Sequence, residues 1–149
     1  MAITASGLYV ATFVDVLDTT QLALDLDLET HKVAMFTNSI TPNFTSDTAY
    51  GASPYDANEV SGTGYSAGGV ALTSTTFTGA SGTSTFDAAD TSWSSSTITN
   101  ARGALIYADA LAGNNAICLV NFGADYSTQA GLFLITWSAS GIFAIDLTP

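Results

Sequence analysis

The sequence predicts a mainly β protein: an antiparallel β-sandwich or barrel of about seven strands, preceded by a short N-terminal helix. Three observations support this fold class. The 149-residue chain is rich in Thr, with 22 residues, and Thr suits a pleated surface, as do Val, Tyr and Phe. Short apolar runs recur at intervals of roughly 8–14 residues, separated by turns that contain Gly or Asn. Only one stretch has helical periodicity and no linker divides the chain, so residues 1–149 are predicted to form a single domain.

The predicted helix covers residues 8–17. Residues 1–6 before it are predicted to form an extended arm, so that arm and helix together span about residues 1–18. Apolar side chains at positions 9, 10, 13, 14 and 17 fall on one helical stripe. Ser6 has a side chain suited to the N-cap of this helix. Several residues of the segment are β-branched, so a strand is the alternative.

Seven strands are predicted from apolar patterns. In residues 32–38, Val and Met alternate with Ala and Phe, so each face of this strand carries apolar side chains. Residues 116–123 form a continuous apolar run, which predicts burial on both faces. The other five predicted strands occupy residues 70–77, 83–88, 97–109, 131–138 and 142–147.

A long loop and a glycine-rich run separate the first two predicted strands. Residues 39–58 lack periodicity, and a loop of this length tends to be either a binding loop or disordered. Residues 59–69, EVSGTGYSAGG, carry four glycines and predict a backbone that turns sharply. The large side chains of this region have no evident core partner, so we predict that they contact another subunit or a partner protein. The predicted contact residues are Asn43, Phe44, Tyr50, Tyr55 and Tyr65.

The charge balance is strongly acidic. Thirteen Asp and Glu residues face two basic residues, giving a formal net charge of −11. Lys and Arg are needed to neutralise phosphate, so neither nucleic acid nor an anionic membrane surface is predicted as a partner. The sequence begins without a basic leader and has no apolar stretch near the ~20 residues of a membrane span, so no export signal is predicted. Arg102, the only arginine, is predicted to form a structural ion pair with a carboxylate.

No cofactor or metal site is predicted. Residues 22–28 alternate leucine with small or acidic residues, which raises a Ca²⁺ site as an alternative. The glycine turn and ligand series of an EF-hand are missing there, so we predict a solvated acidic face. The single cysteine, Cys118, lies in an apolar run and is predicted to be a buried hydrophobic residue.

An enzyme is not predicted either. The single histidine, His31, has no triad partner at a recognisable spacing and is predicted to lie at the surface. Asp87 and Asp90, near Trp93, are the one carboxylate pair that suggests glycosidase chemistry, but aspartates at such positions more often form turns. The glycine-rich run lacks the Lys-Ser/Thr pair of a phosphate-binding loop.

Several motifs occur in a fixed order along the chain. The most specific is NEVSGTGYSAGG at residues 58–69, followed by Ala71-Leu72. The other segments are HKVAMFTNS at 31–39, Thr41-Pro42-Asn43 with Tyr50, residues 86–93, residues 97–107, residues 133–137, and Gly141-Ile142 with Leu147. In this order they resemble a family of small virion proteins from tailed bacteriophages. The resemblance covers nearly the whole chain.

The resemblance implies a structural protein of the virion, assembled in the host cytoplasm. The role it favours is that of a capsid decoration (cement) protein, which binds the outside of the shell and stabilises it. Its partners would be the major capsid protein or other virion proteins. A homo-oligomer, specifically a trimer, is the assembly expected of such a protein, because symmetry multiplies weak contacts.

Two alternatives remain open. The first is a neck, tail or fibre-associated structural component, present in few copies per particle. The second is a module that binds host carbohydrate through exposed aromatic rings. Its candidate stacking residues would be Trp93, Trp137, Tyr50, Tyr55 and Tyr65.

Overall fold

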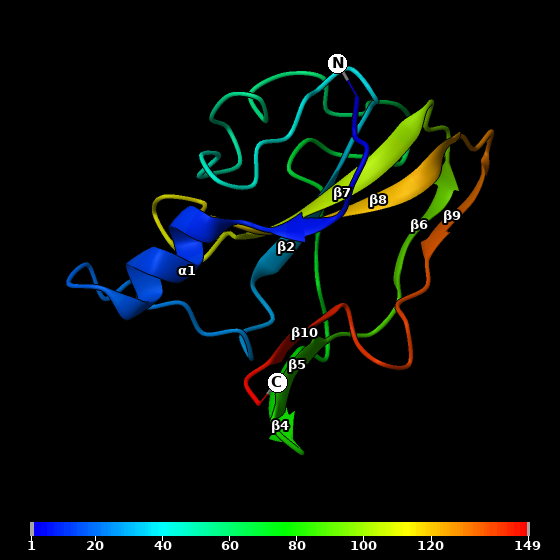
Figure 1. The fold of residues 1–149 in the computed structure, drawn as a ribbon. Helices are drawn as coiled ribbons and strands as arrows, with labels where there is room; N and C mark the ends of the chain where they lie inside the picture. Colours follow the sequence, from blue (N-terminus) through cyan, green and yellow to red (C-terminus); the bar gives the residue numbers. More distant parts are fainter. Residues whose placement is uncertain (1, 149) are drawn as a thin grey trace.

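The computed structural model describes residues 2–148 and is mainly β (Figure 1). Within this range, ten strands pair in antiparallel fashion and one short helix lies near the N-terminus, which confirms the predicted fold class. The elements are β1 (Gly7–Leu8), α1 (Val10–Leu17), β2 (His31–Phe36), β3 (Val70–Ala71), β4 (Thr76–Ala80), β5 (Thr83–Asp87), β6 (Thr91–Ser96), β7 (Ala101–Ala108), β8 (Ala116–Tyr126), β9 (Gly131–Ile135) and β10 (Phe143–Asp146).

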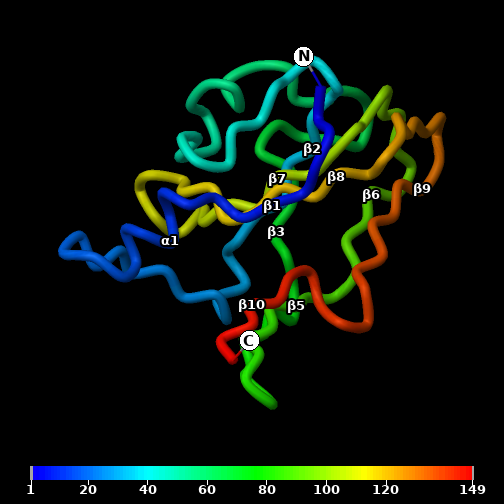
Figure 2. The backbone as a smooth tube through the Cα atoms, viewed as in Figure 1, coloured from blue at the N-terminus to red at the C-terminus, as the bar shows by residue number. Residues whose placement is uncertain are grey.

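The strands form three sheets. A five-stranded sheet in the order β1-β8-β7-β2-β3 lies at the centre, and the others have the orders β10-β5-β4 and β6-β9. Figures 1 and 2 show β7 and β8 running side by side through the middle, with β4, β5 and β10 at one end of the molecule. In residues 2–148 none of the sheets closes on itself, so the barrel alternative is wrong.

One face of the central sheet packs against the two smaller sheets, as in a sandwich. Alternate side chains of β2 and β7 point to this side, where they meet Phe86 of β5, Trp93 of β6 and Phe133 of β9. The rings of Trp93 and Phe133 meet edge to face, with centroids 6.1 Å apart. Burial of this apolar surface is the main source of stability for the fold.

The opposite face of the central sheet is covered by irregular chain. The N-terminal arm and the loop that follows β2 lie over it, and Figure 1 shows this loop arching above β7 and β8. The side chains buried on this side are Ile3, Tyr9, Ala34, Phe36, Ile40, Tyr55, Leu105, Tyr107, Ala116 and Leu119. Burial on both faces was predicted for residues 116–123, but only residues 116–119 of β8 are buried; residues 120–122 are half-buried and Gly123 is exposed, so the prediction is wrong for the second half of the run.

The structure has three more strands than the sequence predicted. The predicted strand 70–77 is split into β3 and β4 by a bend in which Ser74 has a φ of 51°. β6 was missed because five of its six residues are Ser or Thr rather than apolar. β1 has only two residues, too few for an alternating pattern. The strand predicted at 97–109 begins at Ala101, directly after Asn100 with its left-handed φ of 56°.

The predicted helix is confirmed, but its start differs from the expectation. Residue Tyr9 is the N-cap, and its side chain makes no capping hydrogen bond. The predicted cap, Ser6, is wrong: its Oγ accepts a hydrogen bond from the Asn121 backbone N–H at 2.8 Å instead. This contact and the pairing of β1 with β8 hold the residues before the helix in extended form, so the helix begins at Val10.

The glycine-rich run turns sharply, as predicted. Gly62 and Gly69 both have positive φ values, of 140° and 70°. A Cβ on Gly69 would lie 1.8 Å from the Val33 carbonyl oxygen, so the chain passes β2 more closely than any side chain allows. Gly69 therefore sets the approach of β3 to β2.

Candidate interaction surface

The predicted contact residues are not all at the surface. Tyr55 is 2% exposed and Tyr65 is 9% exposed, so the expectation that they lie exposed is wrong. Tyr55 packs edge to face on Phe36, with ring centroids 5.2 Å apart, and its hydroxyl meets that of Tyr9. The loop that carries Tyr55 forms one wall of the core, which is why this aromatic ring lies inside.

Three of the predicted contact residues are more accessible. Asn43 is exposed, and its Oδ1 accepts a hydrogen bond from the Thr45 backbone N–H at 3.1 Å. Phe44 is half-buried, because its ring packs against Tyr9 with centroids 5.4 Å apart. Tyr50 is also half-buried and stacks on Tyr107, with ring centroids 4.4 Å apart and planes inclined by 12°. The accessible part of this loop is therefore mainly polar.

A carboxylate at the start of the glycine-rich run organises these tyrosines. Glu59 accepts hydrogen bonds from the Tyr50 hydroxyl at 2.8 Å, the Tyr65 hydroxyl at 2.7 Å and the Gly68 backbone N–H at 2.7 Å. The Tyr107 hydroxyl donates to the Gly68 carbonyl at 2.9 Å. Burial, assisted by the hydrogen bond to Glu59, raises the pKa of Tyr50 to about 12. This network joins the loop to the central sheet.

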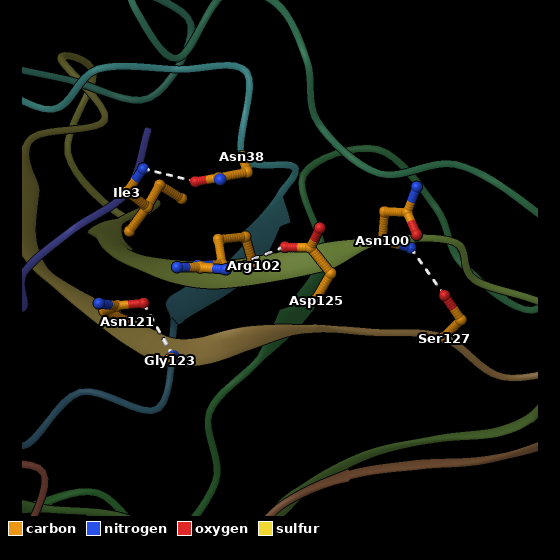
Figure 3. A network of polar contacts seen from close by, with 8 residues as sticks. All are labelled: Ile3, Asn38, Asn100, Arg102, Asn121, Gly123, Asp125 and Ser127. Atoms are coloured by element: carbon orange, nitrogen blue, oxygen red, sulfur yellow. Dashed lines mark hydrogen bonds and ion pairs between the residues drawn. The ribbon is translucent and has the colours of Figure 1, made fainter. Parts of the chain in front are cut away.

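Both basic side chains are engaged in ion pairs. Arg102 on β7 contacts Asp125 on β8, with Nη1 and Oδ1 3.4 Å apart (Figure 3). Lys32 contacts Asp109, with Nζ and Oδ2 3.0 Å apart. All four side chains are partly exposed, so each pair adds little stability, of order 0–1 kcal/mol. The structure thus places Arg102 in an ion pair between neighbouring strands.

His31 is buried, so its predicted surface position is wrong. The ring lies on the core side of β2, 6.2 Å from the ring of Phe86. Its Nε2 donates to the Asp25 carbonyl at 2.7 Å, and Nδ1 has no partner among residues 2–148. Burial lowers the pKa of His31, and the hydrogen bond to Asp25 offsets part of that effect. The ring is therefore a neutral structural group.

Because His31 is buried and neutral, we predict that the protein loses stability in mild acid. The unfolded chain takes up a proton near pH 6.5 and the folded chain only at lower pH, so the unfolded state is favoured as pH falls below 6.5. Between pH 7.5 and 5.5, the free energy of unfolding of the wild type should fall by about 1 kcal/mol more than that of His31→Gln. Urea titrations at the two pH values measure this. Parallel pH profiles for the two proteins would show that His31 is not held neutral.

The other groups singled out for chemistry serve the backbone or the core. Asp87, at the end of β5, accepts from the Ala88 N–H at 2.9 Å, and Asp90 accepts from the distant Trp137 N–H at 3.0 Å, so both carboxylates bind backbone donors. Cys118 is buried, and burial raises the pKa of its thiol to about 12. Among residues 2–148, no group of three or more His, Cys, Asp or Glu side chains is placed to hold a metal ion.

The most distinctive surface is apolar and lies on the outer side of α1. We call Val10, Val14 and Leu17 the outer face; they are 48%, 50% and 86% exposed. Spaced at i, i+4 and i+7, they line one side of the helix. Next to them, an open groove of about 640 Å³ runs between α1 and the C-terminal strand, where Ile145 and Leu147 line it.

A second groove adjoins the first beside α1. It has a volume of about 610 Å³ and is lined mainly by apolar side chains, among them Leu24 and Phe77. Leu17 and Ile145 border both grooves. Figure 1 shows α1 and the following loop projecting from the side of the central sheet. The apolar surface therefore extends around the C-terminal end of the helix.

A smaller apolar patch lies on β8 and β9. Leu132 and Leu134 on β9 and Tyr126 on β8 are each about half exposed, and a groove of about 280 Å³ runs beside them. This groove is less than half the volume of either groove beside α1.

Sequence patterns missed the outer face of α1. The apolar stripe of residues 8–17 predicted a helix, but the stripe alone did not indicate which of its side chains are exposed. A signal was present, however, since in VATFVDVL only Thr12 and Asp15 are polar. A helix that is apolar on nearly all sides is usually buried on all sides by neighbouring parts of the structure.

No family model matches the chain, and comparisons with characterised proteins and with solved structures give no match. The resemblance to tailed-phage virion proteins therefore stays a prediction. Within residues 2–148, the one helix falls well short of the length needed to cross a membrane.

Proposed function

We propose that this chain is a structural protein of a bacteriophage virion, and specifically a decoration protein that binds the outside of the capsid and stabilises it. The observation that carries the proposal is the exposed apolar face of α1 with its two grooves, which suits a protein that works by contact. The collinear motifs, with residues 58–69 as the most specific, supply the virion context.

The proposal includes the partner and the assembly. The partners are the major capsid protein or other virion proteins, and the decoration protein itself is a homo-oligomer, expected to be a trimer at a symmetry axis. Many copies that each bind moderately hold the shell through avidity.

The carbohydrate-binding alternative is weakened by the position of the tryptophans. Trp93 is buried against Tyr65 and Phe133, where it has no free face for a sugar ring. Trp137 is half-buried, and its Nε1 donates to the Thr91 hydroxyl at 3.3 Å. We therefore do not propose sugar binding.

The copy number in purified particles tests the proposal. We expect about one copy per capsid subunit, or one trimer at each local three-fold axis, by quantitative protein staining against the major capsid protein. A few copies per particle would instead identify a neck, tail or fibre component. Absence from the particles would refute the virion assignment.

A further inference from the structure

The helix α1 is apolar on nearly all sides, yet only one side is covered. On the inner side, Thr12 is buried and its hydroxyl donates to the Ala116 carbonyl at 2.5 Å. Phe13 packs edge to face on Phe143, with ring centroids 6.2 Å apart. On the outer face Val10, Val14 and Leu17 meet solvent. In a globular protein an all-apolar helix is usually buried, so the outer face is suited to be covered by another chain.

The shape of the surface suits an inserted segment. The two grooves are adjacent, and Leu17, which is 86% exposed, lines both of them. Side chains of a bound amphipathic segment can enter both grooves beside Leu17. This is the arrangement by which apolar grooves bind amphipathic helices.

The polar rim of the surface is entirely acidic. Asp18 borders the first groove, and Asp25 and Asp27 border the second. The two basic side chains of the chain, Lys32 and Arg102, already pair with other carboxylates. A partner therefore meets apolar side chains edged by uncompensated negative charge, and electrostatic complementarity requires Lys or Arg at the edges of its apolar side.

The same charges argue against a second copy of this chain on the surface. Each copy carries a net charge of −11, and two such surfaces would place carboxylate rims against each other. Any oligomer of this chain is thus expected to form through a different face.

We propose that the outer face of α1 and its flanking grooves bind an apolar segment of another protein that carries Lys or Arg along its edges. The inference rests on the proposed function, since it names the chemistry of the partner segment that the chain would meet in the virion. It concerns a surface of the isolated chain, so it is testable without particles.

The first experiment measures binding of a fluorescently labelled amphipathic peptide, made of Leu and Lys, to the purified full-length chain by anisotropy. The double variant Val14→Ser/Leu17→Ser should bind at least about tenfold more weakly. The matched control Leu132→Ser/Leu134→Ser, which removes two exposed apolar residues from β9, should bind as the wild type does. The same peptide with Glu in place of Lys should not bind.

A second comparison separates the acidic rim from the overall negative charge. Asp18→Asn should weaken binding roughly two- to fivefold, whereas Asp56→Asn, an exposed aspartate outside both groove linings, should have no effect. Circular dichroism and the thermal midpoint of every variant should match the wild type, because all the changed side chains are exposed or half-exposed.

Three outcomes would overturn the proposal. One is equal weakening by the α1 and β9 double variants, and another is equal weakening by the two aspartate variants, since either means non-specific attraction. The third is self-association in sedimentation that Leu17→Ser abolishes, which would make a second copy the occupant. A chain that binds the peptide as expected but is absent from particles would refute the virion assignment alone.

Discussion

Replacing Gly69 by alanine is expected to lower the free energy of unfolding by about 4 kcal/mol, a large share of the stability of a single domain. The new Cβ would lie 1.8 Å from the Val33 carbonyl oxygen and 2.6 Å from its carbon. Both atoms belong to the backbone of β2, in the central sheet, so neither moves without disturbing the pairing of β2 with β3. The left-handed φ of 70° adds a cost of roughly 1–2 kcal/mol.

Gly51→Ala is the matched control for this prediction. Gly51 also has a positive φ, of 84°, but a Cβ there would meet nothing within 4 Å. Gly51→Ala should therefore lower the free energy of unfolding only by the cost of placing alanine at a positive φ, about 1 kcal/mol. Urea unfolding of the three proteins measures the difference, with unchanged m values as the check on two-state behaviour. Equal losses for the two variants would contradict the close approach of residue 69 to β2.

Replacing Glu59 by alanine is expected to lower the free energy of unfolding by about 3 kcal/mol, because three hydrogen-bond donors lose their acceptor at once. Two are tyrosine hydroxyls and one is the Gly68 N–H, all at 2.7–2.8 Å from the carboxylate. Glu59→Gln should cost less, about 1–2 kcal/mol, because an amide still offers one acceptor oxygen but presents an N–H to donors.

Glu29→Ala provides the control for charge, since Glu29 is the only other glutamate and is exposed. It changes the net charge by the same amount, and its side chain accepts one hydrogen bond, from Ser74. We expect Glu29→Ala to lower the free energy of unfolding by about 1 kcal/mol or less. Thermal or urea unfolding compares the variants. If Glu59→Ala were no more costly than Glu29→Ala, the network would not hold the loop to the sheet.

The fold class and most of the central strands were predictable from sequence because they depend on local patterns. The alternation in β2 and the apolar runs of β7 and β8 reflect which side chains must be buried. The glycine turns were predictable for a similar reason, since few other residues adopt positive φ. Strand β6 could not be predicted, because its serines give no hydrophobic pattern. It is a strand because it pairs with β9.

The candidate site was harder to predict because exposure is a property of the assembled chain. Tyr55 and Tyr65 sit in segments whose sequences are typical of a surface. Tyr55 nevertheless packs on one face of the central sheet, and Tyr65 packs against Trp93 in the core on the other face. The burial of His31 likewise depends on its packing against Phe86, which lies on a distant segment. Conversely, the apolar stripe of α1 predicted a helix but not which of its side chains are exposed, and the only signal was the near absence of polar residues in VATFVDVL.

The most direct test of the proposed role extends the copy-number measurement to particles assembled with Leu17→Ser. Leu17 is 86% exposed, so the change should leave the fold intact. We expect about one wild-type copy per capsid subunit, the same number for the control Leu132→Ser, and a several-fold lower number for Leu17→Ser. A full complement of Leu17→Ser on the particles would contradict the claim that this chain acts through the outer face of α1.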